Sequence, residues 1–225
     1  MIVIKRGKEP NSLLKFRKEN PDADYESDMP TDVLKDIREQ MWEEQRGLCA
    51  YCMKKIEAPS VVRIEHCRPR HPKDEQEHDK KATLDFNWML GVCYGNSLVR
   101  GVKPEDTTCD AHRGNTELTV NPFDKLSVRK IKYKADGSIY SDDADINKDV
   151  TETLNLNCQA LSLPQTRKNV LMAEKNRIMR KCRGKSQDVF MRELERTYAS
   201  LVQERNLTPY CGIIISWLES KLKIS

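Results

Sequence analysis

The sequence is organised around residues 47–52 (GLCAYC), where Cys49 and Cys52 form a C-x2-C motif directly after an expected helix. Two thiolates at this spacing can bind one tetrahedral zinc ion, but they need two further ligands from elsewhere in the chain. Cys93 and Cys109 are the candidates, since each is followed by a polar turn. We therefore predict one structural zinc ion held by these four cysteines. A redox-active C-x2-C motif is the alternative, and it lacks the βαβ context that such motifs need.

Composition limits the class of protein. The 225 residues are 38% hydrophobic and 33% charged, and 39 basic against 35 acidic residues give a net charge of only +4. The apolar run at 211–218 (CGIIISWL) is far shorter than the roughly 20 residues of a membrane span, and residues 1–10 lack the apolar core of a secretory signal. We therefore expect a cytoplasmic protein without a membrane segment. Thiols stay reduced in that compartment, so clustered cysteines hold metal or do chemistry there.

Three zones follow one another along the chain, and together they predict an α+β fold. Residues 1–35 are a polar N-terminal arm, in which residues 2–4 could add a short strand. A helix then follows, with Thr31 or Asp32 as the N-cap and Gly47 as the C-cap. Residues 36–125 hold all four histidines and five of the eight cysteines, which is typical of a small domain organised by metal.

Residues 126–225 predict a β-hairpin followed by a helical lobe. Residues 127–140 alternate in polarity and turn at Asp136-Gly137, as a hairpin does. Helices are then expected over 149–161, 164–183, 187–204 and 210–222. The apolar residues 213–217 are expected to form the core of this lobe, with a docking face as the alternative.

Three short motifs lie among the four cysteines. Residues 64–69 (IEHCRP) are typical of a strand that ends in a chemically active histidine, His66; Asn87 lies in 84–90 (LDFNWML); and 109–115 (CDAHRGN) contains Asp110 and His112. Each motif alone has an ordinary structural explanation, as a core histidine, a helix cap or a turn former. Their order and their enclosure by the cysteines favour a functional site.

The order His66, Asn87 and then Asp110 or His112 resembles the HNH nuclease motif, whose core is a two-stranded hairpin and a helix around a catalytic metal (the ββα-metal fold). In four-cysteine members of that superfamily, a structural zinc joins the hairpin to the helix. Over nearly the whole chain the sequence is similar to the Septu and retron-associated HNH endonucleases (PtuB-like). The similarity lies in residues 1–10, 45–52, 65–69, 109–115, 154–157, Leu161, Arg167 and 209–212. The sequence departs from the superfamily pattern in one respect: Cys93 and Cys109 are far apart, where C-x2-C is usual. We interpret residues 94–108 as an inserted loop.

The resemblance implies an endonuclease with His66 as general base, because a neutral imidazole is available at cellular pH. A divalent cation, Mg²⁺ or Mn²⁺, would act as Lewis acid. Glu65 and Asp110 offer the oxygen ligands that Mg²⁺ prefers, and His112 competes with Asp110 for the third motif position. Asn87 is expected to fix the hairpin loop around His66.

Nucleic-acid contacts are expected next to these motifs. Arg68 and Arg70 follow His66 directly, and Arg113 is placed to meet a phosphate bidentately, with a solvated arginine as the alternative. Residues 167–185 contain eight Lys or Arg and one Glu, which fits either a phosphate-binding run or a solvated helix face.

The resemblance further implies an effector of antiphage defence that acts beside an ABC/SMC-like ATPase (PtuA-like). DNA is the favoured substrate. A nuclease of tRNA or other RNA is one alternative, and a zinc-dependent nucleic-acid-binding module without catalysis is the other.

Overall fold

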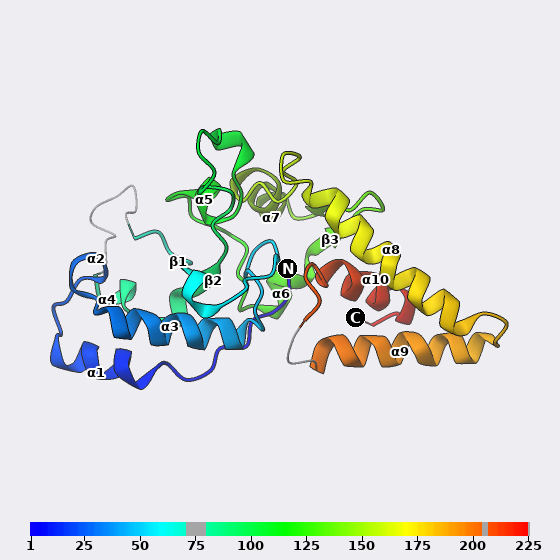
Figure 1. The fold of residues 1–225 in the computed structure, drawn as a ribbon, viewed down its shortest axis with the longest axis horizontal. Coiled ribbons are helices and arrows are strands. Elements are labelled where there is room, and N and C mark those ends of the chain that lie inside the picture. The colour runs from blue at the N-terminus through cyan, green and yellow to red at the C-terminus, as the bar shows by residue number, and fades with distance from the viewer. Residues whose placement is uncertain (71–79, 204–206, 225) are drawn as a thin grey trace.

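The computed structural model describes residues 1–70, 80–203 and 207–224 (Figure 1). The fold is α+β, with two small antiparallel sheets of two strands each among helices and long connections. In Figure 1, helices α1 and α3 lie side by side at one end of the molecule, and α8, α9 and α10 pack together at the other. None of the helices in the described ranges has both the length and the apolar character that a membrane span requires.

The N-terminal segment contains α1 (Asn11–Glu19), α2 (Tyr25–Asp28) and α3 (Thr31–Glu44). Residues 1–10 form no regular element, so the strand suggested at residues 2–4 is absent; instead the Ile4 amide donates to the Pro122 carbonyl (2.9 Å). Helix α3 starts at Thr31, with Pro30 at the N-cap instead of the predicted Thr31 or Asp32, because Pro30 cannot lie deeper in a helix. It ends at Glu44, before the predicted Gly47. Its stripe of buried Val33, Ile37 and Met41 packs into the main core.

The central segment holds the first sheet. Strand β1 (Arg63–His66) pairs antiparallel with β2 (Met89–Val92), with Arg63 opposite Val92 and His66 opposite Met89. Short helical elements flank them: α4 (Lys80–Thr83), α5 (Asp110–Arg113) and 3-10 turns at Pro59–Val61, Phe86–Trp88 and Pro104–Asp106. The strand predicted to end at His66 therefore does end there.

The second sheet joins β3 (Ile131–Tyr133) to β4 (Ile139–Ser141) through the turn predicted at 136–137. The hairpin is shorter than expected, because residues 125–129 form α6 (Lys125–Arg129), capped by the Asp124 carboxylate. That N-cap outweighs the alternating pattern over 127–130. Helix α7 (Ala144–Lys148) and one π-helical turn (Asp149–Thr153) follow, where the sequence predicted one helix over 149–161.

The C-terminal lobe consists of α8 (Leu163–Cys182), α9 (Gln187–Gln203) and α10 (Gly212–Leu222), close to the predicted ranges. Ile213, Ile214 and Leu218 are buried in its core, as expected for this apolar stretch. The lobe is attached to the central segment at the cysteine knuckle, where the Tyr210 amide donates to the Met53 carbonyl (3.0 Å).

The three predicted zones are not separate packing units. The zone boundaries expected after residues 35 and 125 fall inside α3 and α6. One core cluster takes Leu13 from the first zone, Met89 from the second and Leu154 from the third. The fold therefore depends on contacts among all three.

Candidate functional site

The four predicted cysteines come together as one cluster, and this prediction is confirmed. Their sulfur atoms all lie within 4.8 Å of one another. The Cys49–Cys109 and Cys93–Cys109 sulfurs are 3.8 Å apart, and the Cys52–Cys93 sulfurs 3.7 Å. A tetrahedral site with zinc–sulfur bonds of about 2.3 Å has sulfur–sulfur edges of about 3.8 Å, whereas a disulfide requires about 2.05 Å. The cluster therefore fits a structural metal ion such as zinc.

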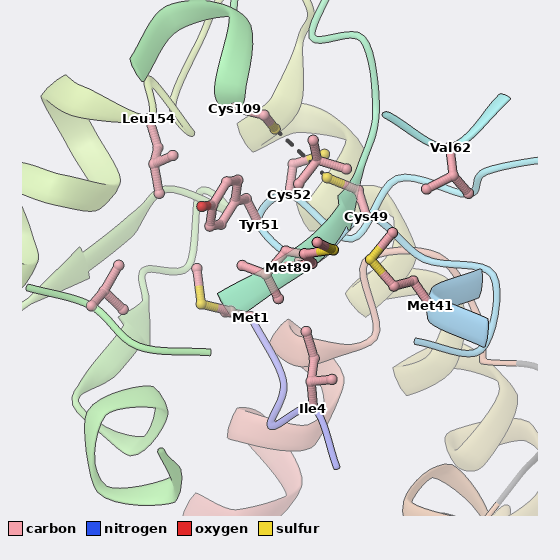
Figure 2. Packing of buried hydrophobic residues seen from close by; sticks show 14 of the residues in the cluster. Met1, Ile4, Met41, Cys49, Tyr51, Cys52, Val62, Met89, Cys109 and Leu154 are labelled. Carbon is pink, nitrogen blue, oxygen red and sulfur yellow. Dashed lines mark hydrogen bonds between the residues drawn. The ribbon is translucent and has the colours of Figure 1, made fainter. Parts of the chain in front are cut away.

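The first half of the cluster is a tight turn. The Cys49 amide donates to the Lys54 carbonyl (2.9 Å), and the Lys54 amide donates to the Cys52 sulfur (3.4 Å). Met53 takes a left-handed φ of 63° to close the turn. Figure 2 shows the sulfurs of Cys49, Cys52 and Cys109 facing one another among apolar side chains of the main core.

In the second half of the cluster, 15 residues form a loop between Cys93 and Cys109. The Thr108 amide donates to the Gly95 carbonyl (3.0 Å), so the two ends of the 94–108 loop meet beside the cluster. The amide of Cys109 and the hydroxyl of Thr108 both donate to the Leu154 carbonyl (2.9 Å each). The inserted loop thus leaves the sulfur positions undisturbed. Sequence reasoning missed the anchoring role of Thr108 and Leu154.

The sulfurs of the cluster differ in how readily they lose a proton. Hydrogen bonds from Cys109, Cys49 and Cys52 hold the pKa of Cys93 well below its ordinary value. Hydrogen bonds to its partner sulfurs raise the pKa of Cys109. A metal ion binds deprotonated sulfur. Cys93, whose pKa is lowered, is the sulfur of the cluster that favours this form.

Arg113 does not occupy the position predicted for a phosphate ligand. Its side chain is 1% exposed, forms an ion pair with Glu65, and donates to the carbonyls of His66, Cys67 and Thr116 (2.7 Å each). These bonds tie α5 to the end of β1. The expectation of a phosphate contact is corrected accordingly: the guanidinium is used within the protein.

Glu65 and Asp110 form a carboxylate pair between two arginines. Burial and the neighbouring Asp110 raise the pKa of Glu65 to about 7, against the lowering effect of Arg113. Asp110 pairs with Arg63, its carboxylate oxygen 2.5 Å from the guanidinium Nε. The two carboxylates predicted to share a cation are therefore neighbours.

His112 is not part of that pair. Its Nδ1 lies 2.9 Å from the Pro104 carbonyl and 3.3 Å from the Thr107 hydroxyl, so the ring faces the inserted loop. Within the described ranges, the four cysteines are the only group of three or more potential metal donors. Of the two candidates for the third motif position, Asp110 is thus the one that lies beside Glu65.

His66 lies on the other side of the strand from Glu65, because successive side chains of a strand alternate between its faces. Its Nε2 is 2.9 Å from the Thr83 carbonyl, and the Tyr25 ring lies edge-on at 4.5 Å between centroids. The carbonyl can only accept, so Nε2 carries the proton and Nδ1 keeps its lone pair. Nδ1 is buried without a hydrogen-bond partner among the described residues. Burial lowers the pKa of His66 to about 4, so the ring is neutral at pH 7.

The loop between the strands holds the remaining predicted residues. Asn87 is exposed, and its side-chain amide donates to the Asp85 carboxylate (3.0 Å), so it shapes the turn before β2 and makes no bond to His66. Arg68 stacks on Trp88, with the guanidinium 4.0 Å from the ring centroid, and Arg70 pairs with Glu26 (2.5 Å). Both arginines remain near the loop after β1, where phosphate contact was predicted.

The basic run over 167–185 is partly used within the protein. Arg167 is 1% exposed and donates to the Gly137 carbonyl (2.6 Å), joining the β3–β4 turn to α8. Arg177 and Lys181 both pair with Glu193 of α9. The run is therefore in part a packing and ion-pair face.

The arrangement can bind one metal ion in sulfur ligands and holds a neutral histidine near a carboxylate pair. No protein-family model matches this chain, and a search of curated proteins finds no match either.

Proposed function

We propose that this protein is a metal-dependent endonuclease of the HNH type, which hydrolyses phosphodiester bonds in nucleic acid, with DNA as the favoured substrate. The observation that carries the proposal is His66, whose ring is neutral, fixed at Nε2 and, among the residues that the structure describes, unpartnered at Nδ1. It ends a hairpin that the cysteine cluster joins to the helix carrying Asp110. A ββα-metal core built from these elements, as the sequence resemblance implies, is part of the proposal.

His66 is suited to the role of general base. Phosphodiester hydrolysis needs a water molecule that loses a proton as it attacks phosphorus, and a neutral imidazole nitrogen accepts that proton. Thr83 fixes the tautomer that leaves Nδ1 free to do so. The ring is only 3% exposed, so substrate must reach Nδ1 by displacing the side chains that cover it, Tyr25 among them.

Glu65 and Asp110 would hold a divalent cation such as Mg²⁺ or Mn²⁺. Magnesium is commonly bound by one or two carboxylates together with water and substrate phosphates. When bound, the cation would supply Lewis-acid stabilisation of the charge that develops on the phosphoryl group. Two arginines lie beside these carboxylates, Arg63 and Arg113. Arg63 is the one that a phosphate can approach, because its side chain is 41% exposed beside Asp110.

The wider role rests on the resemblance. We propose that the nuclease is a cytoplasmic antiphage effector acting with an ABC/SMC-like ATPase, on DNA in preference to tRNA or other RNA. One second candidate is a zinc-organised nucleic-acid-binding module without catalysis. The burial of His66 and the pairing of Glu65 with Arg113 favour that candidate.

Cleavage assays separate these functions. The purified protein is incubated with plasmid DNA and with total tRNA, in Mg²⁺, in Mn²⁺ and in EDTA. We expect cation-dependent cleavage, which His66→Ala lowers at least about 100-fold by removing the general base while the bound zinc is retained.

His112→Ala is the matched control, because that ring faces the inserted loop; it should keep its cleavage activity. Wild-type protein that binds either nucleic acid but cuts neither in any cation would assign the non-catalytic module. Undiminished cleavage by His66→Ala would remove His66 from the mechanism.

A further inference from the structure

A second candidate site lies away from the carboxylates and His66. A cavity of about 850 Å³ opens between the N-terminal residues, the β3–β4 hairpin and helices α8, α9 and α10. It shares no lining residue with the proposed nuclease site or the cysteine cluster. Its volume falls within the range of sites that bind small organic ligands.

The lining of this cavity is strongly cationic. Its lining includes seven basic residues and one acidic residue, Glu219; the basic ones are Lys5, Arg46, Lys125, Arg129, Lys132, Lys134 and Lys175. Lys132 forms an ion pair with Asp142 outside the cavity. Within the part of the chain that the structure describes, no ion pair engages the other six. Because like charges gathered around one space repel, the arrangement is stabilised by an anionic occupant.

Aromatic side chains lie among these cations. Tyr133, Tyr140 and Trp217 line the cavity and are half-buried. The Lys175 ammonium lies 5.2 Å from the centroid of the Trp217 ring, and the Lys134 ammonium 5.6 Å from that of Tyr140. The cavity therefore has two places at which an aromatic ring lies next to a positively charged side chain.

The rest of the lining narrows the chemistry of the ligand. Leu171, Ile213 and Ile215 provide apolar surface, which an inorganic phosphate or polyphosphate would leave in contact with water. A purely apolar ligand would leave the cations uncompensated. The ligand that uses both has a planar ring and several negative charges.

We propose that this cavity binds a free nucleotide, with the base stacked on an aromatic ring and the phosphates held by the surrounding lysines and arginines. Stacking on aromatic side chains and phosphate binding by lysine are both established contributions to nucleotide affinity. The volume suits one nucleotide better than a continuous strand. This inference does not depend on the proposed nuclease activity.

A ligand in this cavity would contact residues that belong to, or pack against, the cysteine knuckle. Arg46, in its lining, directly precedes the turn that leads into Cys49, and its guanidinium donates to the Val202 carbonyl of α9 (3.1 Å). Gly212, also in the lining, lies against Met53 of the cysteine knuckle. A bound nucleotide would thus connect the helical lobe to the knuckle.

Calorimetric titration of the full chain tests the proposal, with no divalent cation added so that substrates stay intact. The probes are ATP, adenosine, inorganic triphosphate and a six-nucleotide single-stranded DNA. We expect ATP to bind, and adenosine and triphosphate each to bind at least about tenfold more weakly, because each lacks half of the contacts.

Paired variants locate the site. Lys134→Met with Lys175→Met should weaken ATP binding about tenfold or more, whereas Lys168→Met with Lys185→Met, which removes the same charge from exposed positions outside the cavity, should not. Unfolding temperatures of both double variants equal to that of the wild type show that the fold is kept.

Four results would overturn the inference: no binding of ATP by the wild type, equal loss of binding in both double variants, triphosphate binding as tightly as ATP, or binding of the oligonucleotide alone. Binding of the oligonucleotide without binding of ATP would indicate that the cavity belongs to a nucleic-acid-binding surface. His66→Ala should bind ATP normally, so the failure of either proposal leaves the other standing.

Discussion

Arg113 donates hydrogen bonds to three carbonyls and pairs with Glu65, and it does so at 3% exposure. A buried carboxylate that loses its cation is costly, because neither water nor another charge replaces the lost partner. We therefore expect Arg113→Met to lower the free energy of unfolding by about 3–5 kcal/mol, measured by urea denaturation.

Arg63→Met is the matched control, because the Arg63 side chain is 41% exposed and its ion pair with Asp110 lies near water. Its loss should cost no more than about 1 kcal/mol. Equal effects of the two variants would contradict the structural role of Arg113.

His66 and His112 offer a second test at single residues. His66 binds a carbonyl through Nε2, and His112 binds one through Nδ1, so the two rings should carry their protons on opposite nitrogens. Nitrogen-15 NMR of the imidazole rings reads the tautomers directly. The same tautomer in both rings would contradict the geometry.

The same spectra follow the titration of His66, whose pKa is lowered from 6.5 to about 4 by burial. We expect this ring to stay neutral when the pH falls to about 5. The unfolded chain binds this proton more readily, so the contribution of His66 to stability is full above pH 6.5 and is lost between 6.5 and 4. Protonation of His66 near pH 6.5 in the folded protein would be the contrary result.

Among the elements, the 94–108 loop depends on one glycine. Gly95 has φ +54°, and a Cβ added there would lie 1.9 Å from the Thr108 carbonyl oxygen. Gly95→Ala must therefore push Thr108 away and separate Cys93 from Cys109. We expect strain of roughly 2–3 kcal/mol and, because bound zinc is lost, the further loss of the folding free energy that the metal supplies. Elemental analysis and thermal unfolding measure the two effects.

Gly101→Ala tests the same loop without the clash. Its φ is +74°, but nothing lies within 4 Å of an added Cβ. Only the backbone cost of about 1 kcal/mol applies, and zinc should stay bound. If both variants kept their zinc, the loop closure at Gly95 would not control the cluster.

The strands and helices differ in how far their sequences predict them. The end of β1 at His66 and the turn at 136–137 follow from local patterns of polarity and turn residues. Helix α6 was missed, because the Asp124 side chain caps two amides and so favours helix over the alternating pattern. The strand at residues 2–4 was wrong for a tertiary reason: Ile4 finds its hydrogen-bond partner in Pro122, outside any sheet.

At the scale of the molecule, the cysteine cluster lies inside the main core, and Cys49, Cys52 and Cys109 are all buried there. A structural metal ion in such a site contributes on the order of 10 kcal/mol of apparent binding free energy to folding. We expect elemental analysis to find one zinc ion per chain. Removing it with a chelator should lower the unfolding temperature sharply.

Cys49→Ser should lose the metal, and Cys182→Ser, at a half-buried position outside the cluster, should keep it. Wild-type protein that is folded and free of metal would contradict the assignment of the four sulfurs as a metal site.

Local spacing and periodicity were enough to predict the C-x2-C turn, the strand ending at His66 and the three C-terminal helices. The polar turns after Cys93 and Cys109 indicated these two cysteines as partners of that turn. Which charged residues lie next to each other follows from the packing of distant segments. That packing paired Asp110 with Glu65, turned His112 toward the inserted loop and buried Arg113 against three carbonyls. It also gathered the cations of the second cavity from segments up to 170 residues apart, as with Lys5 and Lys175. Such meetings follow from how the chain packs, since burial and charge pairing depend on neighbours that no local pattern of residues specifies.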